Sequence, residues 1–251
     1  MKRRPLIAGN WKMNLSVIES RKLAEAIKKS ASNATDRDVM IAPAFTSLSM
    51  VASALEGSRV LLGGQNVCWE EKGAYTAEIS PPMLKELGCT FAIVGHSERR
   101  HIFHEDNVMI NKRVKAAINF DLTPILCIGE TLEERESNNT MPILESQLRE
   151  GLQNLSLPSA SAIVIAYEPV WAIGTGKTAS NEQAQEAHAF TRKILADIFE
   201  KTIASQIRIL YGGSVNPDNV DNLMSQDDID GALVGGAALQ PDTFDRIIHF
   251  N

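Results

Sequence analysis

The sequence predicts an α/β fold in which eight parallel strands close into a β/α barrel. Two observations lead to this prediction: short continuous apolar runs alternate with longer segments of helical periodicity, and the 251 residues contain eight such runs. Continuous apolar runs are typical of strands that are covered on both faces, as in a parallel sheet with helices packed outside it. Eight β/α units in about 250 residues match a closed barrel, while an open, doubly wound sheet is the alternative that the pattern leaves.

The predicted strands take up residues 5–10, 38–43, 59–66, 90–95, 123–129, 162–168, 206–213 and 229–236. Between them, apolar residues recur at intervals of three and four, most clearly over residues 16–30 and 181–201, which predicts helices. Ser80 precedes Pro81, and Asn216 precedes Pro217. In both pairs we expect the first residue to cap a helix and the proline to occupy the first helical position.

The composition is that of an ordinary globular protein, with 44% hydrophobic and 22% charged residues. No linker-like stretch divides the chain, so residues 1–251 are expected to form one domain. A net charge of −6 with scattered lysines and arginines argues against a nucleic-acid surface. The start of the chain resembles neither a signal peptide nor a membrane span. Three cysteines without metal-binding spacing are expected to be buried, reduced thiols in a cytoplasmic protein that holds no metal.

Polar residues at the strand ends are the candidates for function, because the active site of such a barrel lies where the strands end. The sequence puts there Asn10, Lys12, His96, Glu98, Glu168, Ser214, Gly235 and Gly236. This set combines a carboxylate base, an imidazole, a cation and glycine-rich backbone that can approach an anion. The other histidines, His101, His104, His188 and His249, are expected at the surface.

The segment after Glu168, residues 169–179, reads "PVWAIGTGKTA". Loops are normally polar, whereas this one carries Trp171 and Ile173. Its letters partly match two nucleotide-binding motifs, but a Walker loop would need glycine at Trp171, and a dinucleotide-binding loop would follow its strand directly. We therefore expect a lid that closes over the carboxylate and excludes water.

The connection over residues 66–79 is also unusual, since its fourteen residues exceed the usual length of about two to six. It carries Trp69, Tyr75 and Thr76, which a free surface loop has no reason to display. The loop therefore predicts contact with a second subunit, and a loop packed on its own barrel is the alternative.

The motifs "AGNWKMN", "GGQNV", "GAYTAEIS", "VGHSERR", "CIGETLEERE", "AYEPVWAIGTGKTA", "YGGSV" and "GALVGGA" resemble those of the triosephosphate isomerases. They occur in that family's order over essentially the whole chain. The resemblance implies a TIM barrel that interconverts dihydroxyacetone phosphate and D-glyceraldehyde 3-phosphate through an enediolate, in glycolysis and gluconeogenesis. It further implies a cytoplasmic homodimer that acts on a small phosphorylated triose and needs neither cofactor nor metal.

The resemblance also implies a role for each matching residue. Glu168 would move a proton between two substrate carbons, and His96 would polarise the carbonyl. Lys12 and Asn10 would stabilise the enediolate, with Glu98 orienting Lys12 and His96. We expect Glu168 to be more basic than usual because its apolar cover removes water. We expect His96 to be neutral because it precedes a helix, an arrangement for which this family is the standard example.

The remaining matching residues would bind phosphate, form the lid or join two subunits. The phosphate would lie on backbone N–H groups of Ile173, Gly174, Ser214, Gly235 and Gly236. The lid would consist of Pro169, Val170, Trp171, Ala172, Ile173, Gly174, Thr175, Gly176, Lys177, Thr178 and Ala179. The loop with Trp69, Tyr75 and Thr76 would enter the neighbouring subunit and contact Asn10, Lys12 and Glu98. Two positions depart from the family pattern: Ala77, where glycine is more common, and Ala238, where serine is common.

Two alternatives remain open from the sequence. An aldolase-like barrel enzyme that also binds phosphate would need a buried lysine on a strand, whereas the sixth predicted strand ends in Glu168. A non-catalytic barrel would keep the fold without needing the polar set at the strand ends.

Overall fold

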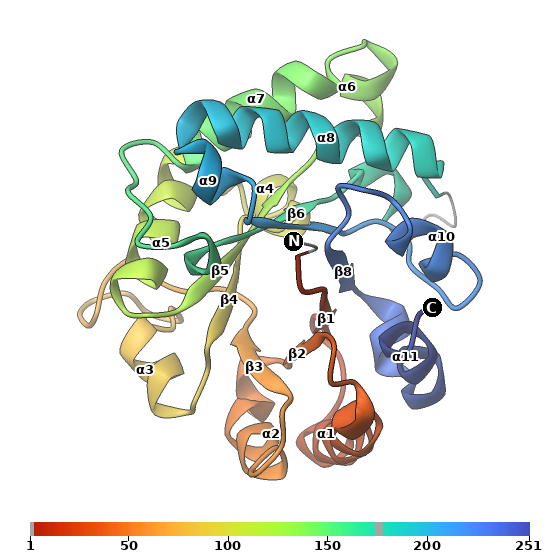
Figure 1. The fold of residues 1–251 in the computed structure, drawn as a ribbon. Helices are drawn as coiled ribbons and strands as arrows, with labels where there is room; N and C mark the ends of the chain where they lie inside the picture. The colour runs from red at the N-terminus through yellow and green to blue at the C-terminus, as the bar shows by residue number, and fades with distance from the viewer. Residues whose placement is uncertain (1–2, 174–177) are drawn as a thin grey trace.

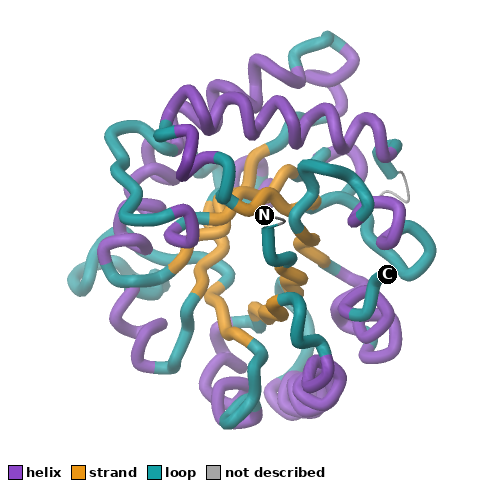
Figure 2. The backbone as a smooth tube through the Cα atoms, viewed as in Figure 1, coloured by secondary structure: helices purple, strands orange, loops and turns teal. Residues whose placement is uncertain are grey.

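The strands form one closed parallel barrel (Figures 1 and 2). The computed structural model describes residues 3–173 and 178–251. Each strand pairs with the next along the chain, and β1 pairs with both β2 and β8, so the sheet has no edge. The closure confirms the predicted fold class and excludes the open sheet. The strands are β1 Leu6–Asn10, β2 Asp38–Ala42, β3 Leu61–Gly64, β4 Phe91–Val94, β5 Thr123–Ile128, β6 Val164–Tyr167, β7 Arg208–Tyr211 and β8 Gly231–Val234.

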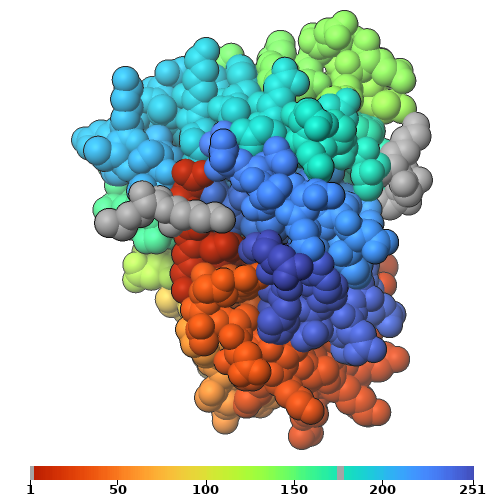
Figure 3. All heavy atoms as spheres, turned by 45° about the vertical axis from the view of Figure 1, so that its right-hand side comes forward, coloured from red at the N-terminus to blue at the C-terminus, as the bar shows by residue number. Residues whose placement is uncertain are grey.

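Helices form a ring outside the strands (Figure 2). They are α1 Val17–Ser30, α2 Leu48–Ala54, α3 Pro81–Glu86, α4 Ser97–His101, α5 Asn107–Asn119, α6 Leu132–Glu136, α7 Thr140–Gly151, α8 Asn181–Ile198, α9 Lys201–Ala204, α10 Val220–Met224 and α11 Pro241–Ile248. Short 3₁₀ turns are η1 Ala31–Asn33, η2 Phe45–Ser47, η3 Ala160–Ala162, η4 Val170–Ala172 and η5 Gly236–Leu239. The ring closes where α1 packs against α11, so that the orange and dark blue parts of the chain lie side by side in Figure 3. Among the helices of the described residues, none combines the length and apolar character of a membrane span.

Local sequence signals explain most helix starts. Ser16 and Ser180 each close a capping box at the start of α1 and α8. Ser80 and Pro81 occupy the N-cap and first helical positions of α3 as predicted, although the Ser80 side chain makes no capping hydrogen bond. The predicted start at Asn216 and Pro217 is wrong, because α10 begins only at Val220. The Asn216 side chain instead accepts the backbone N–H groups of Asp218 and Asn219 at 2.9 and 3.1 Å, which closes a turn.

Both faces of every strand are buried, which accounts for the continuous apolar runs. In β1, Leu6 belongs to the cluster inside the barrel, whereas Ile7 packs outward against the helices. The three cysteines are buried and free, as predicted. His188 is not at the surface as predicted: its side chain is fully buried between Tyr167 and Tyr211. His101, His104 and His249 are exposed.

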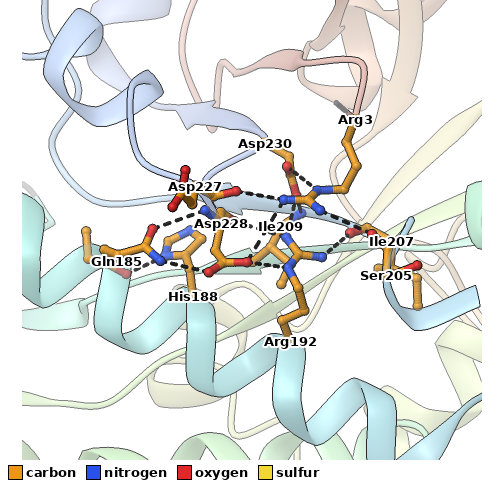
Figure 4. Close-up of polar contacts among 11 residues, drawn as sticks. Arg3, Gln185, His188, Arg192, Ser205, Ile207, Ile209, Asp227, Asp228 and Asp230 are labelled. Atoms are coloured by element: carbon orange, nitrogen blue, oxygen red, sulfur yellow. Dashed lines mark hydrogen bonds and ion pairs between the residues drawn. The ribbon is translucent and has the colours of Figure 1, made fainter. Parts of the chain in front are cut away.

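An ionic network lies at the amino-terminal ends of β7 and β8, opposite the strand ends that carry the predicted site (Figure 4). Arg192 of α8 donates from Nε to Asp228 at 2.6 Å and from Nη2 to Asp230 at 2.8 Å. Arg3 also donates to Asp230. The network ties α8 and the start of the chain to the segment that leads into β8.

Candidate active site

Most of the predicted site residues meet in one cavity of about 520 Å³ at the carboxyl ends of the strands, while Glu98 is not part of its lining. Its lining includes Asn10, Lys12, His96, Glu168, Ile173, Ser214, Gly235 and Gly236. These residues come from the ends of β1, β4, β6, β7 and β8. The parallel barrel therefore brings together side chains that are far apart in the sequence, as the strand-end argument predicts.

Glu168 is held against the end of β4. It follows β6 directly, and its backbone N–H donates to the carbonyl of Ile128 at 2.7 Å. Its carboxylate is 2% exposed. Oε1 lies 3.0 Å from Nε2 of His96, and Oε2 accepts the backbone N–H of Ser97 at 2.9 Å. Both carboxylate oxygens are thus engaged from the segment that connects β4 to α4.

The pKa of Glu168 lies below its ordinary value. Burial raises this pKa, but the charge and hydrogen bond of His96 and the N–H of Ser97 lower it by more. The expectation of a more basic carboxylate is therefore wrong for this arrangement. The sequence suggests the apolar cover, but it does not reveal that His96 and the Ser97 N–H compensate for the lost water.

His96 is shifted in the opposite direction. Burial lowers its pKa, while the carboxylate of Glu168 raises it by more, so the pKa lies above its ordinary value. The backbone N–H of Glu98 points at Nδ1 over 3.3 Å, which favours the neutral ring as the helix argument predicts. The net shift of the His96 pKa is nevertheless opposite to the one that the helix argument predicts, because Glu168 faces the ring.

Lys12 has an unusual backbone, with φ at 51°. Non-glycine residues rarely adopt this left-handed conformation, which is found mainly where structure around it enforces it. Its N–H donates to Oδ1 of Asn10 at 3.0 Å, and its carbonyl accepts from Nε2 of Gln65 at 2.7 Å. Its Nζ lies 2.7 Å from Oε1 of Glu98. Glu98 therefore lies beside Lys12 as predicted, and its Oε2 is 3.5 Å from Nδ1 of His96.

Another part of the cavity wall is glycine-rich backbone after β7 and β8. A Cβ on Gly212 would lie 2.8 Å from Cγ of Glu168, and one on Gly213 would lie 2.3 Å from the hydroxyl of Tyr211. A Cβ on Gly235 would lie 3.5 Å from Cε of Lys12. Gly212 and Gly213 therefore leave room for the carboxylate and the tyrosine, whereas a Cβ on Gly235 would make only an ordinary contact with Lys12. Ser214 and Gly236 continue the same wall.

The first part of the predicted lid is anchored on a carboxylate that the sequence did not single out. Glu130 is fully buried and accepts from Nε1 of Trp171 at 2.9 Å, from the hydroxyl of Tyr167 at 3.2 Å and from Arg135 at 2.9 Å. The guanidinium of Arg135 also lies 4.9 Å from the centre of the Trp171 ring. Ile173 lines the cavity. Gly174, Thr175, Gly176 and Lys177 of the predicted lid, and with them the predicted phosphate contact of Gly174, lie outside the described residues.

The predicted dimer loop is packed at its base and exposed at its tip. Trp69 contacts Tyr75 edge to face, with ring centres 6.0 Å apart. The guanidinium of Arg113 lies over the ring of Trp69. Thr76 is exposed and Tyr75 is 41% exposed. Ala77 has φ at 76°, which explains why glycine would suit this position.

Comparisons with known proteins point to one family. The family model described as "Triosephosphate isomerase" matches residues 5–251. A triosephosphate isomerase of Syntrophotalea carbinolica is 53% identical over 248 residues, which cover 99% of this chain and 98% of the relative. Those of Endomicrobium trichonymphae and Geobacter metallireducens are each 51% identical, with 99% of both chains covered.

Proposed function

The chain belongs to the triosephosphate isomerase family, and on that premise we propose how its residues divide the chemistry. The enzyme interconverts dihydroxyacetone phosphate and D-glyceraldehyde 3-phosphate, a reaction of glycolysis and gluconeogenesis. We assign the base to Glu168 and the polarising group to His96. The observation that carries this assignment is the 3.0 Å contact between Glu168 Oε1 and His96 Nε2 on the wall of the cavity.

Glu168 takes the proton from the carbon beside the carbonyl. The electron pair of that C–H bond forms the C=C bond, and the π pair of the carbonyl moves onto its oxygen to give the enediolate. His96 gives a proton to this oxygen and takes one from the neighbouring hydroxyl. Glu168 then returns its proton to the other carbon. A substrate oxygen that binds Nε2 of His96 would replace Oε1 of Glu168 there, which frees the carboxylate to act on carbon.

Lys12 and Asn10 stabilise the negative charge that develops on the substrate oxygens. Glu98 orients Lys12 through their 2.7 Å ion pair. The phosphate rests on the backbone of Ile173, Ser214, Gly235 and Gly236, together with Gly174. An aldolase-like reaction is not supported, because Lys12 is the lysine that lines this cavity in the described part of the chain, and its Nζ is paired with Glu98 rather than isolated in an apolar pocket.

Substitution of Glu168 by Gln tests the assignment. We expect turnover to fall by about three orders of magnitude while a phosphorylated glycolate still binds, since the change removes the base and leaves the anion site. Turnover is measured in a coupled isomerase assay and binding by calorimetry. A variant with near-normal turnover would remove Glu168 from the role of base.

We also propose that the protein, as one domain over residues 1–251, acts as a cytoplasmic homodimer. The exposed loop tip with Tyr75 and Thr76 supports the dimer, as do three large apolar side chains at other exposed positions: Met13 is 94%, Ile102 is 64% and Phe103 is 60% exposed. Ile102 and Phe103 are neighbours in the chain, and large apolar side chains that are exposed together are typical of a protein interface. Sedimentation at micromolar concentration is expected to give a dimer, and a monomer with full activity would overturn the proposal.

A further inference from the structure

Arg100 of α4 connects three parts of the fold behind the active site. Its Nε donates to the carbonyl of Gly95 at 2.8 Å, and its Nη2 donates to the carbonyl of Cys127 at 2.9 Å. Its Nη1 donates to Oδ1 of Asn107 at 2.7 Å. One partly buried guanidinium therefore joins the end of β4, the end of β5 and the start of α5.

The two carbonyl acceptors lie next to the segments that hold Glu168 and His96. Gly95 immediately precedes His96 and has φ at +70°, and a Cβ there would lie 3.2 Å from Nη2 of Arg100. Cys127 immediately precedes Ile128, whose carbonyl accepts the N–H of Glu168 at 2.7 Å. A shift of either backbone segment would change the 3.0 Å contact between Glu168 and His96.

The charge of Arg100 has no direct counter-charge. Its three acceptors are neutral, and within residues 3–173 and 178–251 no carboxylate oxygen lies within 4.0 Å of its guanidinium. Its neighbour Arg99, by contrast, is paired with Glu105 at 2.7 Å. A guanidinium stays protonated even when burial lowers its pKa, so this positive charge is permanent.

Several titratable groups lie around Arg100 and around the Glu168–His96 pair. Those that face Arg100 are Glu105, Cys127, Glu150 and Glu168. Those that face the Glu168–His96 pair from the other elements are Lys12 after β1, Glu98 in α4 and Cys127 in β5. Of the two cations that the structure describes around the Glu168–His96 pair, Lys12 lines the cavity and Arg100 does not.

We propose that Arg100 is a positioning residue for the isomerase reaction, which fixes the backbone beside Glu168 and His96 and adds near them a positive charge that makes no direct ion pair. The proposal rests on the roles assigned above to Glu168 and His96. In the described part of the chain, Arg100 is not among the residues that line the cavity.

Two substitutions separate the geometric contribution from the charge. Arg100→Met removes both, and we expect kcat to fall by about 10- to 100-fold, because small displacements of reacting groups carry costs of this size. KM is expected to change little, because the phosphate site lies on the β7 and β8 side. The acidic limb of the pH profile of kcat/KM is expected to move to higher pH, because a lost positive charge disfavours the Glu168 carboxylate. Arg100→Lys keeps the charge but loses the planar fork, so kcat should fall while the acidic limb stays in place.

Arg192→Lys is the matched control, because it makes the same change in a partly buried, multiply bonded arginine at the opposite end of the barrel (Figure 4). It should lower the unfolding temperature without changing kcat below that temperature.

Wild-type kcat in Arg100→Met, or in Arg100→Lys if the Met variant does not fold, would overturn the proposal. So would a loss of kcat in Arg192→Lys equal to that in Arg100→Lys. Glu168→Gln is assayed in parallel: if it retains turnover, the assignment of the base fails, whereas its inactivity beside fully active Arg100 variants refutes the inference about Arg100 alone.

Discussion

Acidification is expected to destabilise the fold through His188, a histidine that takes no part in catalysis. Its ring is fully buried, and burial lowers its pKa from 6.5 to about 4. The unfolded chain therefore binds a proton at this residue below about pH 6.5, while the folded protein does not until about pH 4. The contribution that the neutral, buried His188 makes to the free energy of unfolding is therefore fully present above pH 6.5 and is lost as the pH falls toward 4. A shift of about 2.5 pKa units corresponds to about 3 kcal/mol, of which most is lost near pH 4.5.

The assay is urea unfolding of the wild-type protein and of His188→Gln, at equal concentrations, near pH 7.5 and near pH 4.5. The Gln variant cannot titrate, so the other groups that protonate over this range contribute equally to both proteins and cancel in the difference. The variant is expected to be less stable near pH 7.5, because it loses the packing of the ring between Tyr167 and Tyr211. Its free energy of unfolding should nevertheless fall by about 2 to 3 kcal/mol less than that of the wild type on acidification. Equal losses in both proteins would refute the argument from burial.

Three further predictions concern the site and its assembly. Lys12→Met should lower kcat and raise KM together, at a combined cost of about 3 kcal/mol in kcat/KM, because the charge faces both substrate and enediolate; unchanged constants in steady-state kinetics would remove Lys12 from this role. Deletion of residues 173–176 should slow isomerisation and release methylglyoxal as the enediolate loses phosphate, and a folded variant at the parent rate without this by-product would contradict the lid. Thr76→Glu should weaken the dimer and depress activity together, as followed by light scattering and the coupled assay; full activity in a dissociated variant would separate the two.

The strands and the main site residues could be predicted because their signals are local. A strand buried on both faces has a continuous apolar run, and the parallel barrel then brings residues such as Lys12 and Glu168 to one end without further information. The same reasoning placed His188 wrongly at the surface. It lies on the buried face of α8 with Ala184 and Leu195, but its polar side chain suggested the surface. Its aromatic neighbours come from β6 and β7, which the helix pattern does not reveal.

The residues that support the site depend on contacts across long sequence distances. Gln65 binds the carbonyl of Lys12 across 53 positions, and Glu130 binds Trp171 across 41. Each lies in a motif that identifies the family, yet nothing in its spacing indicates the atom that it binds. Such partners follow from the three-dimensional register of the barrel, which a strand pattern does not determine to within one side chain.

The opposite pKa shifts of Glu168 and His96 follow from the same contact and determine when that contact is strong. The pKa of Glu168 is lowered from 4.5, so its contribution to stability is present above that value and is lost as the pH falls through the folded pKa. The pKa of His96 is raised from 6.5, so its contribution is present below that value and is lost as the pH rises through the folded pKa. The contact between Glu168 and His96 therefore contributes most to stability between pH 4.5 and 6.5. Above the folded pKa of His96 the ring is neutral and Glu168 remains ionised, which leaves a carboxylate that is held less tightly and is ready to accept a proton from carbon.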